Sequence, residues 1–455
     1  MKELFVSVII KKRRLYMETE KILIKNGHII DPASKKNYVG SIYIENGKIS
    51  AIAEGLDSWK NIMPKGETVK QIDAKGMVVS PGFIDTHSHF RDPGFTYKED
   101  IFSGAEAAKA GGYTGIIMMA NTKPAIDSVE TLKQVLQKGK ETGIDIMSAA
   151  NITEDMEGKQ PVDINTLKNE GAKVFTDDGK PITNTELIEE VMQKAADEDV
   201  ILSFHEEDPE FVGTPGLNQG KASEIFAIEG AHRKAEYEMV KRDIELAKKY
   251  GTKILIQHIS AKESVELVRQ GKKNGVKVFA EAAPHHFSLT EDDLIEARET
   301  GRETLYKMNP PLREEEDRLS IIQGLKDGTI DLIATDHAPH SEEEKSRRPY
   351  GNAPSGITGL ETALSLGIMN LVKPGYLSME RFIECMSTAA AKIYGIEGGS
   401  MEKGAKADLV IFDPEEKYLF KNHKSKGANS PWRDSELIGK VKYTIANGKV
   451  VYSDV

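Results

Sequence analysis

The chain has 455 residues, which is enough for a large barrel with an appended module. Its 61 Lys and Arg are interspersed with 72 Asp and Glu, and the net charge of −11 argues against nucleic acid or an anionic membrane as a partner. The single cysteine, Cys385, excludes an internal disulfide, and no apolar run is long enough to span a membrane, so we expect a cytoplasmic protein.

The first residues are predicted to be an extension in front of the fold. Residues 5–10 are apolar, but a basic cluster at residues 11–14 comes after them, whereas a signal peptide carries its charges first. The sequence leaves open whether Met1 or Met17 is the natural start. We therefore expect residues 1–16 to lie outside the fold.

Both ends of the chain show the alternation of apolar and polar residues that is typical of strands. Four such stretches lie at residues 21–30, 40–52, 407–413 and 441–451. Asn-Gly pairs at residues 46–47 and 447–448 mark hairpin turns within the pattern. The similarity of the two ends predicts one small β-sandwich module, formed by residues 17–76 together with residues 396–455.

The middle of the chain alternates short apolar runs with amphipathic stretches. The eight runs are residues 78–84, 115–119, 144–149, 172–175, 200–204, 253–256, 276–280 and 330–334. Helices are predicted at residues 103–110, 128–140, 184–196, 235–249, 261–273 and 316–325. Strand–helix alternation implies parallel strands with crossover helices. Eight runs predict an α/β fold, namely a (β/α)₈ TIM-like barrel over residues 77–395.

The residues that come directly after these runs are the candidates for chemistry, because such barrels place their active sites at the carboxyl ends of the strands. The strand ends supply four histidines and two carboxylates: His87, His89, His205, His258, Asp178 and Asp336. The i, i+2 spacing of the first two histidines puts both on one face of a strand. Nitrogen and carboxylate ligands without thiolate suit Zn²⁺. Six ligands exceed the need of one tetrahedral ion, so we expect two metal ions that share a carboxylate and a hydroxide.

Each of these residues also has an ordinary explanation. A lone histidine at a strand end is more often a packing residue than a ligand, and Asp336 alone could cap a helix. Chance is a poor explanation for such residues at five strand ends of one barrel, and their joint occurrence therefore favours the metal site. Asp336 is also the predicted catalytic acid/base, because it can take a proton from the nucleophile and pass it to a leaving nitrogen.

Four motifs resemble those of dihydroorotases. They are HSHFRDPG at residues 87–94, MNPPLR at 308–313, ATDHAPH at 334–340 and GLET at 359–362. The resemblance runs from about residue 22 to the C-terminus. It implies reversible conversion of N-carbamoyl-L-aspartate to L-dihydroorotate, a small-molecule step of pyrimidine biosynthesis. It also implies a homo-oligomer, with aspartate transcarbamoylase as a candidate partner.

The resemblance implies a role for each site residue. His87, His89 and Asp336 would bind one zinc ion and His205 and His258 the other, with Asp178 and a hydroxide bridging the two Zn²⁺ ions of each chain. The substrate carboxylate would contact Arg91, Asn121 and His340, and the substrate ring would contact Asn309, Ser355 and Gly356. The chemistry of Arg91 supports its role, because a guanidinium is the natural partner of a carboxylate.

The alternatives to this interpretation concern the substrate. Ala120, Ser355 and residues 225–237 depart from the family pattern near the expected substrate. Allantoinases, hydantoinases and dihydropyrimidinases are the alternative, but they usually lack the arginine that Arg91 supplies here. A non-catalytic homologue is a further alternative, against which all six metal ligands are present.

Several local assignments rest on the same resemblance. Asp178, beside Gly179, matches the bridging position better than Asp177, and Lys173 lies too early in its strand to be a carboxylated bridge. The pair at residues 285–286 is interpreted as histidines outside the ligand set. Residues 341–352 could be a lid that closes over substrate or an ordinary solvated loop.

Overall fold

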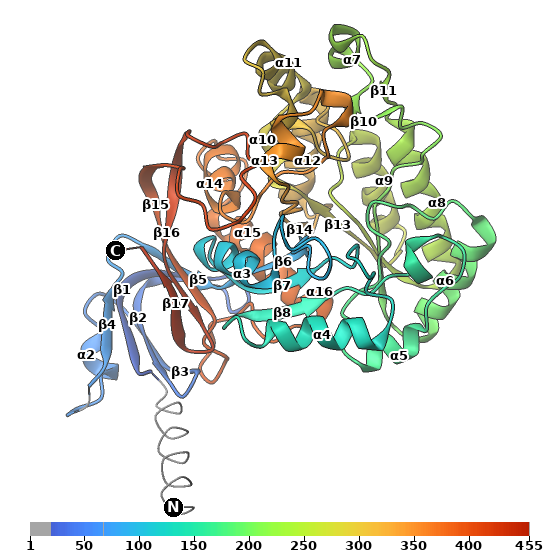
Figure 1. The fold of residues 1–455 in the computed structure, drawn as a ribbon. Helices are drawn as coiled ribbons and strands as arrows, with labels where there is room; N and C mark the ends of the chain where they lie inside the picture. Colours follow the sequence, from blue (N-terminus) through green and yellow to red (C-terminus); the bar gives the residue numbers. More distant parts are fainter. Residues whose placement is uncertain (1–19, 67, 455) are drawn as a thin grey trace, which may run out of the picture.

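The computed structural model describes residues 20–66 and 68–454. The predicted extension at residues 1–16 lies outside them. The described chain has two parts, a β-sheet that contains both ends and a larger part in which strands and helices alternate (Figure 1).

Strands from both ends of the chain form one eight-stranded sheet of order β17-β16-β15-β5-β1-β2-β3, in which β4 pairs with β1. The Asn-Gly pairs at residues 46–47 and 447–448 have positive φ angles, as two-residue hairpin turns require. The shared sheet brings the two ends together; its sandwich arrangement and the domain bounds stay predictions. The strands are β1 (Ile22–Asp31), β2 (Lys36–Glu45), β3 (Lys48–Glu54), β4 (Lys70–Asp73), β5 (Val78–Pro81), β15 (Leu409–Leu419), β16 (Glu436–Ala446) and β17 (Lys449–Ser453).

Parallel strands form the centre of the larger part. They are β6 (Phe83–Ser88), β7 (Tyr113–Met118), β8 (Asp145–Ser148), β9 (Ile201–Phe204), β12 (Lys253–Ile256), β13 (Val278–Ala282) and β14 (Leu332–Ile333). They make two ladders, β6-β7-β8 and β14-β13-β12-β9. Parallel bridges join the ladders at both ends, from Phe175 to Ala150 and Leu202 and from His337 to Ser88. The pairing order therefore closes on itself, which is consistent with the predicted (β/α)₈ barrel.

The six predicted helices are all present, and each boundary lies within two residues of its prediction. They are α3 (Ile101–Ala110), α4 (Val129–Gly139), α6 (Thr185–Asp197), α8 (Lys234–Tyr250), α9 (Lys262–Lys273) and α12 (Glu315–Asp327). Side chains of Asp100, Ser128 and Asn184 accept hydrogen bonds from the first-turn N–H groups of α3, α4 and α6, which explains where these helices begin.

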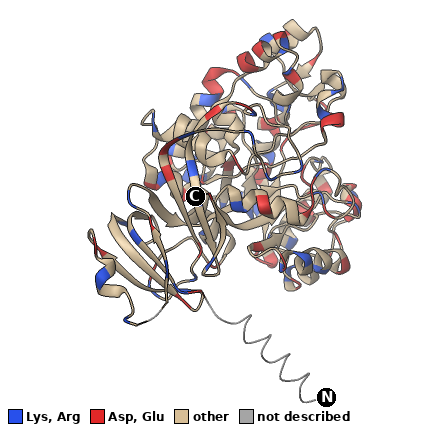
Figure 2. Ribbon diagram, turned by 60° about the vertical axis from the view of Figure 1, so that its left-hand side comes forward, with Lys and Arg blue, Asp and Glu red and all other residues tan. Residues whose placement is uncertain are grey.

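Shorter helices and strands lie within the remaining connections. They are α2 (Trp59–Ile62), α5 (Ile164–Asn169), β10 (Thr214–Asn218), α7 (Lys221–Phe226), β11 (Gly230–Ala231), α10 (Pro284–Ser288), α11 (Glu291–Glu299), α13 (Glu342–Ser346), α14 (Ala363–Gly367), α15 (Met379–Ile383) and α16 (Ala389–Tyr394). Lys and Arg positions are interspersed with Asp and Glu positions along the ribbon of both parts of the molecule (Figure 2). No helix in the described ranges is long and apolar enough to cross a membrane.

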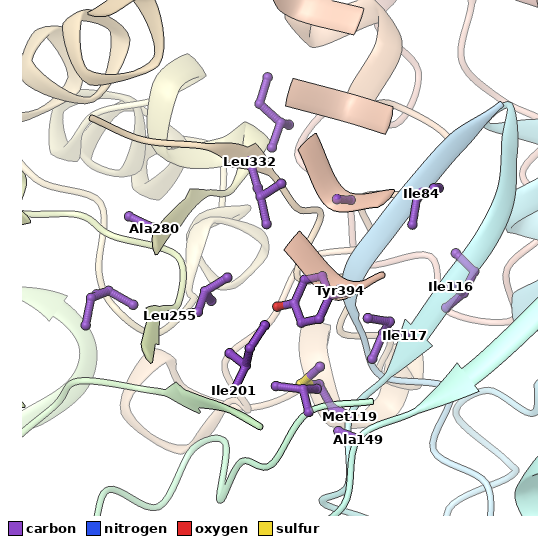
Figure 3. Packing of buried hydrophobic residues seen from close by; sticks show 14 of the residues in the cluster. Ile84, Ile116, Ile117, Met119, Ala149, Ile201, Leu255, Ala280, Leu332 and Tyr394 are labelled. Carbon is purple, nitrogen blue, oxygen red and sulfur yellow. The ribbon is translucent and has the colours of Figure 1, made fainter. Parts of the chain in front are cut away.

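Aliphatic side chains fill the space between the barrel strands. Ile117, Ile201, Leu255 and Leu332 come from four different strands, and the ring of Tyr394 lies among them (Figure 3). All five are buried. Burying an aliphatic side chain of this size contributes about 1.5–3 kcal/mol. The packed interior leaves the carboxyl ends of the strands as the place for a polar site.

Two predicted barrel strands differ in the structure. The run at residues 78–84 is two strands, because β5 pairs with β1 and β15 of the terminal sheet and only β6 enters the barrel. The chain changes sheets at Gly82, where a Cβ atom would lie 2.3 Å from Thr114 Oγ1. In the run at residues 172–175, only Phe175 forms bridges, one to each neighbour, so no strand is formed.

Candidate active site

The six predicted ligands lie at the carboxyl ends of the barrel segments. His87 lies near the end of β6, and His89 comes directly after that strand. His205 comes directly after β9, and His258 lies two residues beyond β12. The set is completed by Asp178, after the bridge at Phe175, and Asp336, after β14. All six are buried, with at most 7% of each residue exposed.

The Asp178 carboxylate lies between the four histidines. Its Oδ1 is 3.5 Å from His87 Nε2, and its Oδ2 is 3.4 Å from His89 Nε2. On the other side, Oδ1 is 3.6 Å from His205 Nδ1 and 3.8 Å from His258 Nε2. Asp178 therefore belongs to two groups of three potential ligands, which is the position that a bridging carboxylate must occupy.

Asp336 lies beside the first of these groups. Its Oδ1 is 3.1 Å from His89 Nε2 and 3.6 Å from His87 Nε2. The same carboxylate lines the open pocket, so it faces both the histidines and the space where a ligand would lie. This position suits a group that binds a metal and also exchanges a proton with a substrate.

A carboxylate behind His87 fixes the orientation of its ring. His87 Nδ1 donates to Glu281 Oε1 at 2.6 Å, and the second oxygen of Glu281 accepts a bond from Thr86 Oγ1 at 3.2 Å. Both partners are buried. The hydrogen bond leaves His87 Nε2 as the ring atom that faces Asp178 and that could bind a metal ion in place of its proton.

Two further side chains orient the rings of His89 and His205 in the same way. His89 Nδ1 donates to Asn121 Oδ1 at 2.9 Å, and the Asn121 amide donates to Asp178 Oδ2 at 3.0 Å. His205 Nε2 donates to Glu207 Oε2 at 3.0 Å. Asn121 was expected to contact substrate; the structure places it on the pocket wall with its side chain bonded to two potential metal ligands.

The donor set fits a divalent metal ion. His87 Nε2 is buried and has no hydrogen-bond partner among the described residues. His205 Nδ1 and His258 Nε2 lie 3.0 Å apart, so two ring nitrogens face each other at a distance that needs a proton or a cation between them. Neutral imidazoles and carboxylates are ligands for Zn²⁺ and related ions. These buried groups can therefore hold metal.

Both carboxylates are held in the ionised form. Burial raises the pKa of Asp178, but the charge of His87 and hydrogen bonds from His205 and His258 outweigh it and hold the pKa well below its ordinary value. Burial likewise opposes ionisation of Asp336, whereas the hydrogen bond from His89 lowers its pKa below the ordinary value. Asp336 is thus present as a carboxylate, the form that a proton acceptor requires.

Three residues of the site have a strained backbone. Arg91, His258 and Asp336 have φ angles of 57°, 25° and 46°, in the left-handed region that non-glycine residues rarely adopt. Each such residue costs about 1–3 kcal/mol, which the surrounding contacts must offset. The strain turns each of these side chains away from the direction that a regular strand or helix would give it.

A cavity of about 210 Å³ opens over His89, His205, His258 and Asp336. All six predicted substrate contacts line it: Arg91, Asn121, Asn309, His340, Ser355 and Gly356. The structure therefore gathers residues that lie up to 265 positions apart in the sequence (91 to 356) around one small space.

His340 lies in this wall as a neutral ring. Its Nε2 donates to the Ser355 carbonyl at 2.8 Å, and its Nδ1 lies 3.4 Å from Lys98 Nζ. Burial is the main cause that lowers the pKa of His340 to about 2, and the charges of Arg91, Lys345 and Lys98 add to it. Positive charge near the substrate end of the pocket therefore comes from Arg91 and lysines, not from this imidazole.

The structure distinguishes the alternatives for the bridge. Asp177 points away from the pocket and accepts bonds from the backbone of Ile152 and the hydroxyl of Thr153. Lys173 is exposed. His285 and His286 are buried outside the ligand groups, and His286 Nε2 donates to the Pro310 carbonyl at 2.9 Å.

The sequence interpretation missed Glu281 and Glu207. Glu281 comes directly after the predicted strand at residues 276–280, and Glu207 lies two residues after His205. The rule that located the ligands, namely that reactive side chains stand at the end of each apolar run, also points to both carboxylates.

Removing the Glu281 carboxylate is expected to weaken metal binding. Loss of such a hydrogen-bonding partner costs about 10–100-fold in metal affinity. We expect Glu281→Ala to show this loss in competition with a chelator, and Glu281→Gln, which still accepts from His87 Nδ1, to show less. Unchanged affinity in the alanine variant would contradict the orienting role.

This fold and buried ligand set define a class of metal-dependent hydrolases, and comparisons with known proteins agree. Residues 78–451 match the model of the amidohydrolase family, so the chain belongs to that family. Curated relatives named dihydroorotase include those of Clostridioides difficile, 51% identical over 95% of this chain and all of that protein, and of Clostridium acetobutylicum, 47% identical with the same coverage. Among solved structures, an L-hydantoinase (dihydropyrimidinase) from Arthrobacter aurescens superposes with a TM-score of 0.82 at 25% identity, over 95% of this chain and 96% of the other.

Proposed function

We propose that this protein is a dihydroorotase that interconverts N-carbamoyl-L-aspartate and L-dihydroorotate with release or uptake of water. The observation that carries the proposal is that Arg91 lines the same cavity as the potential metal ligands. The substrate is a cyclic amide that carries a carboxylate, and the cavity offers a guanidinium beside a site for amide hydrolysis. Full-length similarity to relatives named dihydroorotase supports it.

The residues would hold two zinc ions, one between His87, His89 and Asp336 and one between His205 and His258, with Asp178 shared. Bound metal ions supply Lewis acidity and lower the pKa of a water molecule. Asp336 takes the proton as the water oxygen forms its bond to the ring carbonyl carbon, and returns it to the ring nitrogen as the carbon–nitrogen bond breaks. Arg91 holds the carboxylate while Asn309 contacts the ring.

A panel of substrates tests this proposal. The wild-type enzyme is expected to hydrolyse dihydroorotate, and Arg91→Met to raise KM for it by about 10²-fold, because charge-assisted hydrogen bonds to the carboxylate are lost. Neutral dihydrouracil serves as the control, and the same variant should leave its turnover unchanged. A wild-type enzyme that hydrolyses a hydantoin or allantoin but not dihydroorotate would favour the second candidate.

The second candidate is a hydantoinase or dihydropyrimidinase, which the similarity to the Arthrobacter enzyme supports. We favour the first because those substrates need no carboxylate partner. A role in pyrimidine biosynthesis, a cytoplasmic location, a homo-oligomeric state and aspartate transcarbamoylase as a partner belong to the same proposal. So do the (β/α)₈ barrel at residues 77–395 and the β-sandwich of residues 17–76 and 396–455.

A further inference from the structure

Residues 341–354, here called the strap, connect His340 to Ser355, which both line the pocket. The strap contains α13, and Lys345 at its centre is fully buried, with 0% exposed. Beneath the strap lies Lys307, only 2% exposed. Two buried lysines therefore lie at the interface between the strap and the chain that leads to Asn309.

The two lysines bind each other's segment. Lys345 Nζ donates to the Lys307 carbonyl and to the Pro354 carbonyl, each at 2.8 Å. In return, Lys307 Nζ donates to the Tyr350 carbonyl at 2.8 Å and the Gly351 carbonyl at 3.2 Å. Three of these hydrogen bonds join the strap to Lys307, and the fourth, from Lys345 to Pro354, connects two parts of the strap itself.

The Lys307 carbonyl connects the two lysines to the pocket. Gly356 N–H donates to the Lys307 carbonyl at 2.9 Å, beside the bond from Lys345. The Ser355 hydroxyl donates to Asn309 Oδ1 at 2.8 Å. Residues 355–356 are therefore held in place by Lys307 and Asn309.

Neither ammonium has a carboxylate within ion-pair distance among the described residues. Burial alone lowers the pKa of Lys307 to about 8, and burial together with the charge of Lys307 lowers that of Lys345. By contrast, Lys98 on the outer side of the strap lies 3.3 Å from Glu344. Burying an ammonium without a carboxylate partner is costly. Lys345 lies behind the pocket wall, because the Lys307 carbonyl that accepts its hydrogen bond also accepts one from Gly356 N–H.

We propose that Lys345 and Lys307 form a reciprocal clamp that positions the backbone at residues 355–356 and favours a substrate that carries a carboxylate. The charge part of this inference rests on the proposed function. In this proposal, the two lysines position residues 355–356 and contribute to specificity for a substrate with a carboxylate. The strap is then a fixed support behind Ser355 and Gly356, which line the pocket, instead of a solvated loop.

The clamp is tested first without any substrate. Arg347 and Arg348 in the strap are exposed, and the bond between them is a trypsin site. We expect Lys345→Met to speed cleavage after Arg347 at least about tenfold, because cleavage depends on the population of the open strap. Lys326→Met, which removes an exposed lysine from α12, is the matched control and should cleave as wild type.

Kinetics with dihydroorotate test the charge. Lys345→Met is expected to raise KM about tenfold, more than it lowers kcat, with metal content unchanged. Lys345→Gln keeps two N–H donors for the carbonyls but carries no charge. We expect Gln to restore resistance to trypsin while KM stays raised.

Wild-type cleavage of a folded Lys345→Met protein would overturn the clamp and leave the proposed function intact. A glutamine variant with wild-type KM would overturn the effect of charge. If the wild-type enzyme does not hydrolyse dihydroorotate, the proposed function fails, and the trypsin comparison still decides whether the lysines hold the strap. Melting temperatures of all variants identify any that fail to fold.

Discussion

Replacing Asp336 with alanine is expected to lower kcat by about 10³-fold. General acid–base groups contribute about 10²–10⁴-fold, and Asp336 is the ionised carboxylate that both contacts His89 and lines the pocket. Steady-state hydrolysis of dihydroorotate, together with metal analysis of the purified variant, measures the effect. The four histidines and Asp178 remain in this variant, so it should retain metal.

The control for this experiment is Glu130→Ala, which removes an exposed carboxylate from α4 and should leave kcat unchanged. Asp336→Asn separates the two roles of the residue, because an amide oxygen can still bind metal but cannot take up a proton. Near-normal kcat in Asp336→Ala with metal present would disprove the acid/base role.

Asp178→Ala is expected to remove the connection between the two ligand groups. With the shared carboxylate gone, each group keeps two histidines, so we expect zinc to fall from about two ions per chain to one or fewer. The Lewis acidity that lowers the pKa of water is then lost, and kcat should fall by at least about 10³-fold. Elemental analysis after dialysis gives the metal content directly.

Asp177→Asn is the matched control, because the neighbouring carboxylate is bound to Ile152 and Thr153 and lies outside both groups. It should keep its metal, and its effect should be on stability. A wild-type protein with one zinc per chain, or an Asp178→Ala protein that keeps two, would show that Asp178 does not bridge.

The convergence of the six candidate metal ligands could be predicted from the sequence because these residues obey a local rule. Each lies next to a short apolar run, and parallel strands bring their carboxyl ends together whatever the loops between them do. The roles of Glu281 and Asn121 could not be assigned in this way. They depend on which ring nitrogen meets which side chain, and that is set by the rotation of neighbouring strands.

The burial of Lys345 in the strap could not be predicted from the sequence, for a different reason. Residues 341–352 are highly charged and lysine is rarely buried, so the sequence leaves a lid and a solvated loop as alternatives and does not predict that Lys345 is buried. Burial of Lys345 depends on carbonyls from Lys307 and Pro354 that converge only in the folded chain. The prediction for residues 78–84 was wrong for a related reason, since alternation of apolar residues does not tell to which sheet a strand belongs.

The place of β5 has a consequence for how the protein is made. β5 pairs with β15, whose residues leave the ribosome among the last, and a single glycine separates β5 from the strand that contains His87. During synthesis, β5 can pair with β1 early, but its second partner is available only after about nine-tenths of the chain has been translated. A protein truncated before Leu409 would therefore leave one edge of β5 unpaired, beside the strand that carries His87.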